Sequence, residues 1–363
     1  MRVFHILDEA SNKNYSIINI INSYSSLKKI KSKIIIGKKK NLTSELISKK
    51  NIFQINFPSN IFKYKSTINK FLVLNKPDVI HVHGIWRPIY MLFIILADKF
   101  KIPVIIQPHG MFLNEALNSG SKFKAIVKKI IIFFYTFYVK KKIFIAVTNE
   151  EKKSIKKHFK QNKVFILRNP IMFQRLISKK IKTQISFFGR FSPHKNINLI
   201  INSFIKSNLD KKWKLNLYCI KDDESYETYI RQQVKIHRVG KRIKIQKPIF
   251  KKTLKLKKMS ESFINILMSK SEILSLSVLE ALSVGTKSLV SKNLKFPKKI
   301  SKLLFFSNPN INDMSNKINQ ITKSYKPSLK LRKNIKDKFI NHYNSYDTIR
   351  EYQRILKKIN HKN

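Results

Sequence analysis

Short apolar runs alternate with longer amphipathic segments along this chain, and the alternation occurs twice. In the first half, strands are predicted at 2–7, 32–37, 76–84, 102–110, 141–149 and 163–170, and helices at 17–27 and 91–100. Strands that alternate with helices over about 170 residues indicate a parallel sheet covered by helices on both faces.

The same rhythm restarts after a weakly patterned stretch that follows Pro170. Strands are predicted at 184–190, 214–220, 242–248, 262–268 and 287–291, and helices at 196–206, 277–285 and 347–359. The pattern predicts an α/β chain with two Rossmann-like, doubly wound domains, over 1–170 and 171–340, with the boundary between Pro170 and Thr183. A C-terminal helix within 341–363 is expected to return toward the N-terminal domain. A length of 363 residues suits two domains.

The composition narrows the class of protein less than the pattern does. The formal net charge of +55 suits a nucleic acid, an anionic membrane surface or a phosphorylated substrate as partner. The alternative is an AT-rich genome, whose codons favour lysine over glycine and so produce the same charge without any anionic partner. The single cysteine, Cys219, excludes an internal disulfide and a cysteine-based zinc site. The N-terminus lacks a secretory pattern, and the apolar run 130–139 is too short to span a membrane, so we expect a cytoplasmic protein.

Unusual polar residues fall where the predicted strands end. In two parallel-sheet domains in series, the carboxyl ends of the strands are expected to surround a cleft that binds ligands. The stretch FFGRFSPHKN, residues 187–196, places Arg190 at a strand end and Lys195 just before a helix. A guanidinium, an ammonium and a helix N-terminus form a good diphosphate site. The alternative is that Arg190 caps a loop and Lys195 is one solvated lysine among many.

Two glutamates bracket an uncharged interval in SEILSLSVLEALSVGT, residues 271–286. We expect Glu272 on a loop after a strand that ends near Met268, and Glu280 in the first turn of a helix that begins around Ser277. Carboxylates in those places accept paired hydrogen bonds from sugar hydroxyls. The alternative is a helix-capping glutamate with a solvent-exposed one.

Histidines and a pair of aspartates complete the set of candidates. His109 ends an apolar strand before a glycine, which suits a catalytic or sugar-binding role as well as a structural one. His81 and His83 share one face of a strand, but no third metal ligand follows at a suitable spacing, so no metal site is predicted. Asp222 and Asp223 are interpreted as solvated loop acids rather than as a cation site.

Taken together, the order of these motifs resembles glycosyltransferase family 4. The segments DVIHVHGIW, IIQPHGMF, AVTNEE, FFGRFSPHKN and SEILSLSVLEALSVGT occur in the family's order and spacing, from Arg2 to about Tyr352. The resemblance implies the GT-B fold and a retaining sugar transfer from a nucleotide-diphosphate sugar, without a metal or other cofactor. Cationic side chains and helix ends then take the place of a metal.

The resemblance also implies roles for matching residues. Arg190 and Lys195 would hold the donor diphosphate, with Ser275 and Leu276 beside it. Glu280 would bind the ribose, and Glu272 and His109 would act beside the transferred sugar. A further set is expected to line the cleft: His83, Gly84, Gly110 and Gly189.

Several glycines that are usual in the family are absent. The segment DEASNKNYSI after the first strand has none, Ser275 replaces a glycine beside the donor phosphate, and Cys219 and Lys247 stand where glycines are common. These losses keep open a catalytically inactive GT-B protein with a binding or scaffold role. A nucleic-acid-binding protein is the third alternative, and it lacks any zinc-finger, recognition-helix or RNA-binding signature.

The segment 108–142 looks most like members that build lipopolysaccharide, O-antigen or capsule sugars, whose acceptors are lipid-linked or polysaccharide. Aromatic and lysine residues interleave over 122–144, as on a surface that lies on an anionic membrane. The expected partners are therefore a nucleotide sugar, such an acceptor and the inner face of the cytoplasmic membrane. The alternative for 122–144 is a buried helix with a rim of lysines.

Overall fold

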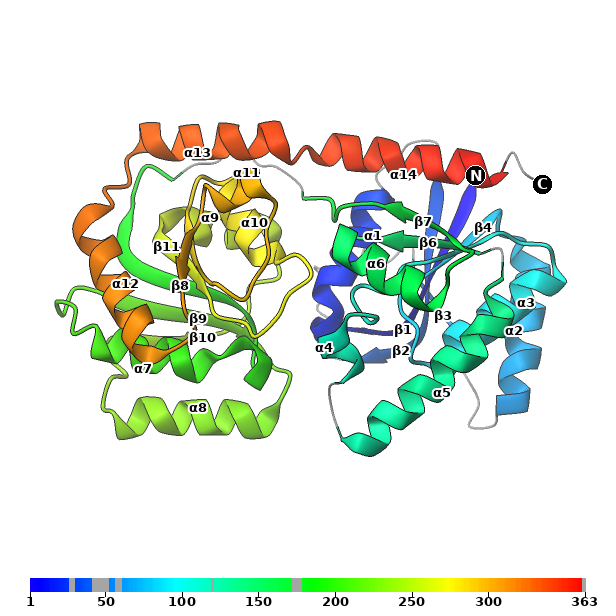
Figure 1. Ribbon diagram of the computed structural model, residues 1–363, viewed down its shortest axis with the longest axis horizontal. Coiled ribbons are helices and arrows are strands. Elements are labelled where there is room, and N and C mark those ends of the chain that lie inside the picture. Colours follow the sequence, from blue (N-terminus) through cyan, green and yellow to red (C-terminus); the bar gives the residue numbers. More distant parts are fainter. Residues whose placement is uncertain are drawn as a thin grey trace. The chain divides into compact units, whose positions relative to one another are not determined.

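The computed structural model describes residues 1–25, 30–40, 52–55, 61–118, 121–140, 142–171 and 178–360 (Figure 1). The chain forms two compact units. Unit 1 comprises Met1–Pro170 with Ser345–Asn363, and unit 2 comprises Ile171–Asn344. Part of the expected boundary stretch, residues 172–177, lies outside the described residues.

Unit 1 is built on a parallel sheet with the strand order β3-β2-β1-β4-β5-β6-β7. Its strands are β1 (Arg2–Ser11), β2 (Lys31–Lys40), β3 (Ile52–Gln54), β4 (Val79–Val82), β5 (Val104–Ile106), β6 (Ile143–Ala146) and β7 (Lys163–Ile166). Its helices are α1 (Tyr15–Tyr24), α2 (Ile61–Asn75), α3 (Pro88–Lys99), α4 (Asn114–Leu117), α5 (Lys122–Tyr138), α6 (Asn149–His158) and α14 (Ser345–Asn360).

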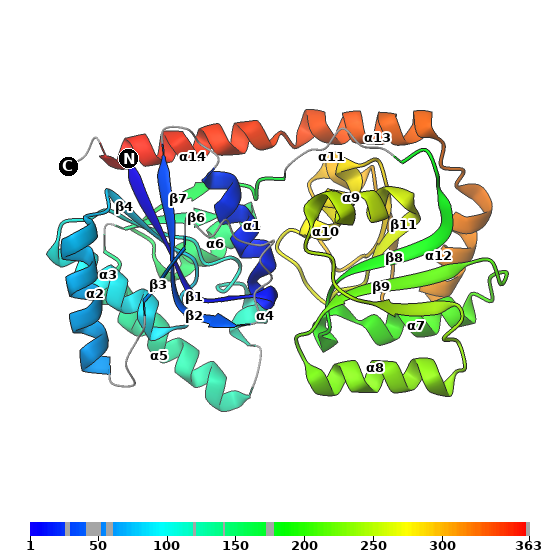
Figure 2. The ribbon, with the colours of Figure 1, turned by 180° about the vertical axis from the view of Figure 1, so that it is seen from behind.

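Alternating residues of β1 pack in two different cores. Phe4 and Ile6 join the apolar cluster formed with α2, α3, α5 and α6, whereas Leu7 packs with residues of α1 and β2. Because side chains alternate across a strand, His5 lies on the same face as Leu7. Figure 2 shows α1 and α14 on one side of this sheet, and the stacked rings of Tyr24 and Tyr352 join these two helices.

Unit 2 repeats the arrangement with the order β10-β9-β8-β11-β12-β13. Its strands are β8 (Lys182–Arg190), β9 (Lys214–Ile220), β10 (Ile243–Gln246), β11 (Ser262–Leu267), β12 (Ser288–Ser291) and β13 (Phe305–Ser307). Its α-helices are α7 (Ile197–Lys206), α8 (Glu224–Ile236), α9 (Lys252–Glu261), α10 (Leu276–Ser283), α11 (Lys298–Ser301), α12 (Ile311–Ser324) and α13 (Leu329–His342). Two parallel Rossmann-like sheets confirm the predicted fold class.

Most strands predicted from apolar runs are confirmed, and their ends differ where pairing decides them. The strand 214–220 is observed with the predicted bounds, whereas β1 continues to Ser11 because its second half pairs with β2. The predicted helix 17–27 begins earlier, at Tyr15, and ends at Tyr24; residues 26 and 27 lie outside the described part of the chain. The segment 347–359 forms most of α14.

Helix α13 is held against the rest of unit 2 by a buried arginine. The Arg332 guanidinium donates hydrogen bonds to the carbonyl oxygens of Ser260 and Ser262 and to the Thr286 hydroxyl. Burial lowers the pKa of Arg332 to about 10, so the group stays charged near neutral pH and the carbonyl dipoles solvate it. Gly285, which follows α10, has a φ of 77° and lies against the Arg332 backbone.

Replacing Gly285 by alanine is expected to destabilise unit 2 by about 3 kcal/mol. The φ of 77° disfavours any Cβ, and a Cβ built there would lie 2.2 Å from the Arg332 carbonyl oxygen. Gly240→Ala is the matched control, because a Cβ there meets nothing within 4 Å. Urea unfolding followed by circular dichroism measures both. Equal midpoints for Gly285→Ala and the unmodified chain would contradict the close contact.

Candidate functional site

In unit 2, the candidate site lies where β8 and β11 end side by side. These two parallel strands pair directly. In the order β9-β8-β11-β12, the chain proceeds from β8 toward one edge of the sheet and from β11 toward the other, so the connection changes direction between them. Crossover connections leave such a pair on opposite faces, so the carboxyl edge between them is left open for a ligand. Arg190 is the last residue of β8, and the loop after β11 carries Glu272.

Arg190 lies at this edge and pairs with an aspartate. Its Nη1 lies 3.1 Å from Asp222 Oδ2, and the Arg190 side chain is 45% exposed. The neighbouring Asp223 accepts a hydrogen bond from the Tyr226 N–H and caps α8. Both aspartates lie in the loop between β9 and α8, as predicted, but they are not simply solvated, because Asp222 forms an ion pair and Asp223 caps a helix.

Lys195 and Glu272 form an ion pair across this edge. Lys195 ends the short 3₁₀ helix η4 (Pro193–Lys195), and both side chains are largely buried. The Ser269 hydroxyl donates to the same Glu272 oxygen at 2.8 Å. The pair therefore joins the turn after β8 to the loop after β11, and the alternative of a solvated Lys195 does not hold.

Backbone contacts fix this turn and this loop together. The His194 Nε2 lies 2.6 Å from the Ser271 carbonyl oxygen, and the Lys270 N–H donates to the His194 carbonyl. Asn196 has a φ of 52° and donates through Nδ2 to the Met268 carbonyl at 3.0 Å. The loop position predicted for Glu272 is confirmed, and its carboxylate is held by neighbours that the sequence did not reveal.

Glu280 lies further along its helix than predicted, and its side chain is buried. Helix α10 begins at Leu276, so Glu280 is its fifth residue and is not in the first turn. Its Oε2 lies 2.5 Å from the Nζ of Lys255 on α9, and both side chains are at most 12% exposed. Neither glutamate is the solvent-exposed residue of the alternative interpretation. Lys255 was missed because nothing in the sequence distinguishes it from the other lysines of α9.

Ser275 and Leu276 form the start of α10. Ser275 is the N-cap residue, but its side chain makes no capping hydrogen bond to the helix and lies 3.2 Å from the Ser277 hydroxyl instead. Its φ of −71° is ordinary for any residue, so the family's glycine is not required by the backbone here. The N–H groups of the first turn are the usual anion-binding feature of a helix start.

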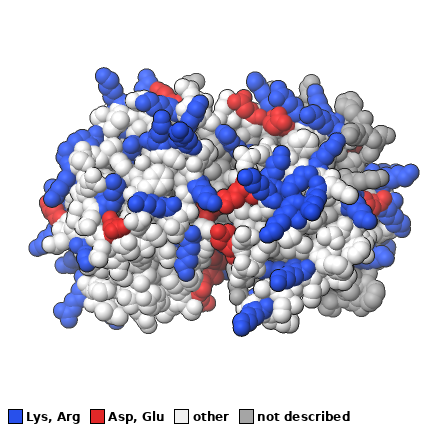
Figure 3. All heavy atoms as spheres, in the orientation of Figure 1, with Lys and Arg blue, Asp and Glu red and all other residues white. Residues whose placement is uncertain are grey.

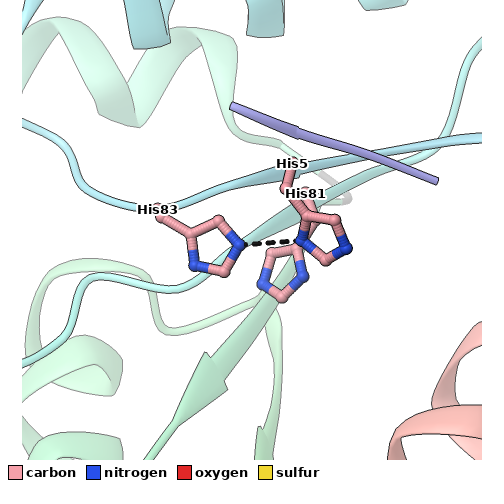
Figure 4. Close-up of side chains that lie close together, drawn as sticks. All are labelled: His5, His81 and His83. Carbon is pink, nitrogen blue, oxygen red and sulfur yellow. Dashed lines mark hydrogen bonds between the residues drawn. The ribbon is translucent and has the colours of Figure 1, made fainter. Parts of the chain in front are cut away.

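In unit 1, three histidines meet at the corresponding pair of strands (Figure 4). His5 of β1 pairs in register with His81 of β4, and His83 follows on the same face, as predicted for His81 and His83. All three side chains are buried. The His81 Nδ1 lies 2.9 Å from the Tyr352 hydroxyl of α14. The sequence offered no third histidine near His81 and His83, and strand pairing supplies it in His5.

His109 is linked to this group by a hydrogen bond. Its Nε2 lies 2.9 Å from His83 Nδ1, and His83 Nε2 lies 2.9 Å from His5 Nδ1. His109 has a φ of 52°, a left-handed conformation that is strained for a histidine and held by its surroundings. The neighbouring Gly110 has a φ of 84°.

A buried carboxylate that the sequence analysis missed holds the loop of His109. Glu151 of α6 accepts hydrogen bonds from the N–H groups of Gly110 and of Val147, the latter at 2.7 Å. Burial raises the pKa of Glu151 to about 7, although both hydrogen bonds act in the opposite direction. The AVTNEE motif contains this residue, and its apolar setting only became apparent from the fold.

Burial keeps the four histidines neutral at neutral pH. It lowers the pKa of His5 to about 3 and that of His109 to about 4. The pKa values of His81 and His83 lie well below the usual range because of burial, and neighbouring imidazoles lower them further. Ring nitrogens of His5, His81 and His83 lie within 4.8 Å of one another, so these are the described residues with the geometry to hold a metal ion.

The predicted cleft glycines lie beside these groups in their own units. Gly84 has a φ of 135°, and the Tyr90 ring packs so close that a Cβ there would lie 2.7 Å from it. A Cβ at Gly189, next to Arg190, would lie 2.6 Å from the Phe187 ring. A side chain at Gly84 or at Gly189 would therefore collide with a neighbouring aromatic ring.

In a comparison with known protein families, two family models match this chain, one in each half. The model of glycosyl transferases group 1 matches residues 168–338, and the model of glycosyltransferase family 4 matches residues 39–175. No curated protein sequence matches the chain.

Solved structures of glycosyltransferases have the same fold over the full length. The Anabaena protein HepE in complex with UDP-glucose is 11% identical, with a TM-score of 0.79, and the match covers 99% of this chain and 100% of HepE. The pneumococcal O-GlcNAc transferase GtfA, solved with UDP and GlcNAc, is 10% identical with a TM-score of 0.77 and 99% coverage of both chains. The lipopolysaccharide outer core galactosyltransferase WaaB is 14% identical with a TM-score of 0.63, covering 97% of this chain and 100% of WaaB.

The two family models, the two Rossmann-like sheets and the full-length likeness to GT-B enzymes agree with one another. The chain is a glycosyltransferase with the GT-B fold and belongs to glycosyltransferase family 4, of the group 1 glycosyl transferases.

Proposed function

We propose that this protein is a retaining glycosyltransferase that moves a sugar from a nucleotide-diphosphate sugar to an acceptor of lipopolysaccharide, O-antigen or capsule biosynthesis. The observation that carries the proposal is the charged group at the ends of β8 and β11. The ends of these strands and the segments that follow them supply two cations, each paired with a carboxylate, and a helix start. That combination suits a diphosphate attached to a hydroxyl-rich sugar.

The leaving group explains the need for Arg190 and Lys195. When the bond between sugar and diphosphate breaks, negative charge develops on the diphosphate oxygens, and fixed cations stabilise that charge. Lys195 is already held by Glu272, so it is oriented before the donor binds. A diphosphate gives Lys195 a second anionic partner, which leaves Glu272 oxygens available to sugar hydroxyls.

Glu280 is assigned to the ribose of the donor. Its carboxylate is fixed by Lys255 from α9 and lies on α10, the helix that begins after the loop of Glu272. The ion pair with Lys255 holds the Glu280 carboxylate in one orientation. His109, a neutral imidazole in a strained turn, is assigned to the transferred sugar as a hydrogen-bonding partner and not as an acid.

The class of acceptor rests on two observations. One of the similar structures is a lipopolysaccharide outer core galactosyltransferase. The second is helix α5, where seven large apolar side chains are between 43% and 73% exposed: Phe123, Ile126, Ile130, Phe133, Phe134, Phe137 and Tyr138. This exposed face, here called the α5 face, contradicts the alternative of a buried helix over 122–144.

The α5 face has the arrangement of a helix that lies on a membrane. At 100° per residue its apolar side chains span an arc of about 140°, opposite the side that buries Ile132 and Tyr135. Exposed lysines flank the arc on both sides, at Lys124 and at Lys122 and Lys129. Figure 3 shows Lys and Arg far outnumbering Asp and Glu on the surface in view. We assign the face to an anionic bilayer surface, where lipid-linked acceptors are presented.

None of the described helices is long and apolar enough to cross a membrane.

A catalytically inactive scaffold remains the second candidate, motivated by the missing glycines. The described backbone does not require them. Ser275, Cys219 and Lys247 are absent from the residues with positive φ, and so is every residue of 8–17. Release of nucleotide diphosphate from a panel of UDP-, GDP- and dTDP-sugars, tested with lipid-linked acceptors, separates the two candidates. A donor at a hundredfold its Kd should also stabilise the fold by about 2.7 kcal/mol.

Lys195→Ala and Arg190→Ala are each expected to lower kcat about a hundredfold, because each removes a fixed charge from the developing diphosphate. The measurement is the initial rate of nucleotide-diphosphate release with the donor found by the panel. Lys182→Ala is the matched control. Lys182 also forms an ion pair, with Glu261 at 2.5 Å, but this pair lies at the amino ends of β8 and β11, away from the candidate site. Equal losses in the variant and the control would show that the ion pairs only support the fold.

The two glutamates are expected to affect different constants. Glu280→Gln should raise the donor KM about tenfold with little change in kcat, because its contact is the same in the ground and transition states. Glu272→Gln should lower kcat, because that contact is assigned to the reacting sugar. Glu261→Gln, with its pair at the amino ends of the strands, should leave both constants unchanged. Unchanged kinetics in folded Glu272→Gln and Glu280→Gln would refute the assignment.

Phe133→Ser combined with Phe137→Ser should release the protein from membranes. Each substitution removes roughly 2 kcal/mol of apolar burial in the bilayer interface, so the two together should weaken vesicle binding on the order of a thousandfold. Co-sedimentation with phosphatidylcholine vesicles containing about one third phosphatidylglycerol, at physiological salt, measures it. The control is Ile236→Ser on α8, an apolar side chain that is 68% exposed outside the α5 face. An unmodified protein that stays in the supernatant would contradict the assignment.

A further inference from the structure

Three imidazoles in unit 1 form a continuous hydrogen-bonded row. His5 Nδ1 lies 2.9 Å from His83 Nε2, and His83 Nδ1 lies 2.9 Å from His109 Nε2. Figure 4 shows the first of these contacts, between His5 on β1 and His83 just after β4. His83 therefore uses both ring nitrogens, and the row runs from a fully buried ring to the residue assigned to the transferred sugar.

The charge state of the row follows from its surroundings. His5 and His83 are fully buried, and no described carboxylate forms a hydrogen bond with any of the three rings. A buried imidazolium without an anionic partner is costly, so the rings are neutral. A neutral imidazole carries one N–H and one acceptor nitrogen.

One proton per ring makes the row directional. If His5 donates from Nδ1 to His83, then His83 must donate from Nδ1 to His109, and the proton of His109 must lie on Nδ1. If His109 donates from Nε2 instead, then His83 donates from Nε2 and His5 keeps its proton on Nε2. In either direction, all three rings carry the same tautomer.

We propose that His83 and His5 are positioning residues that set the tautomer of His109, and thereby decide whether its Nδ1 is a donor or an acceptor toward the sugar. The inner end of the row is closed, because His5 Nε2 is buried without a hydrogen-bond partner among the described residues. A tautomer change at His109 therefore requires the other two rings to change with it. The role of the tautomer in catalysis rests on the proposed function, whereas the shared tautomer itself does not.

His81 provides a built-in comparison. It is a fourth buried imidazole in the same place, and its ring centroid lies 4.1 Å from that of His83, with the two rings tilted by 31°. Its hydrogen bond goes to the Tyr352 hydroxyl, so it is not part of the row. Substituting His81 perturbs the packing of the group without breaking the row.

The test is the nitrogen-15 NMR spectrum of the ligand-free protein labelled at its nine histidines, in which chemical shifts and two-bond couplings report the tautomer of each ring. His5, His83 and His109 should share one tautomer. His83→Gln keeps an amide near the Nε2 position toward His5 and removes the partner of His109. His83→Asn places its amide near the Nδ1 position, toward His109, and removes the hydrogen-bond partner of His5. In both variants the tautomer of His109 should no longer follow that of His5, whereas His81→Asn should leave all three unchanged.

Two results would overturn the proposal. One is a mixture of tautomers along the row in the unmodified protein, which needs no variant and so does not depend on a variant folding. The other is stoichiometric metal, found by elemental analysis, with shifts that show ligation by His5, His81 and His83. Metal would replace the hydrogen bond between His5 and His83, and it would make His81→Asn as disruptive as His83→Gln.

Kinetics then connect the row to catalysis. His83→Gln should lower kcat at least tenfold with little change in the donor KM, because the group facing the transferred sugar changes while the ribose and phosphate contacts remain. A shared tautomer with unchanged kcat in folded His83→Gln would remove the positioning role. Absence of any transferase activity in the unmodified protein would instead count against the proposed function.

Discussion

The strand order of the two sheets is the constraint on which the candidate sites depend. In each unit the first strand pairs with the fourth, and the chain winds outward from that pair in both directions. Right-handed crossovers then place the flanking helices on opposite faces, so the carboxyl ends of the central pair stay uncovered. Arg190 ends one central strand of unit 2 and Glu272 follows the other, and His83 follows a central strand of unit 1. The same topology therefore assembles a charged site in one unit and a neutral polar site in the other.

The free-energy cost of burying polar side chains is offset differently in the two sites. In unit 2, Glu272 and Glu280 each pair with a lysine, which offsets the cost of removing a carboxylate from water. In unit 1, no carboxylate among the described residues forms a hydrogen bond with the imidazoles, and burial leaves them neutral. Charged pairs suit a site where charge develops on a leaving diphosphate. Neutral rings suit a site that only needs to orient hydroxyl groups.

The sequence predicted the sheets well because burial on both faces leaves a local signature, namely short apolar runs between helical segments. It placed Arg190, Lys195 and Glu272 correctly at strand ends for the same reason. It could not predict partners that come from elsewhere in the chain. His5 is an isolated histidine in a strand, and only the pairing of β1 with β4 brings it beside His81 and His83. Lys255 was hidden among many lysines until α9 packed against α10. The start of α10 was misplaced by one residue because Ser275, Ser277 and Leu276 give no distinct helix-start signal.

The scarcity of glycine in this chain can be weighed against what its backbone demands. Gly84, Gly110 and Gly285 have positive φ values, and at Gly84 and Gly285 a side chain would also collide with a neighbour. Positions where the family's glycines were lost, such as Ser275 and Cys219, have ordinary backbone angles. At His109 and Asn196, the left-handed conformation is kept without glycine and is held by hydrogen bonds to His83 and to the Met268 carbonyl. Gly84, Gly110 and Gly285 thus occupy positions that disfavour a side chain, whereas Ser275 and Cys219 occupy positions that tolerate one. These glycines meet demands of the fold itself, so an active enzyme and an inactive scaffold would both keep them, and only an activity measurement separates the two.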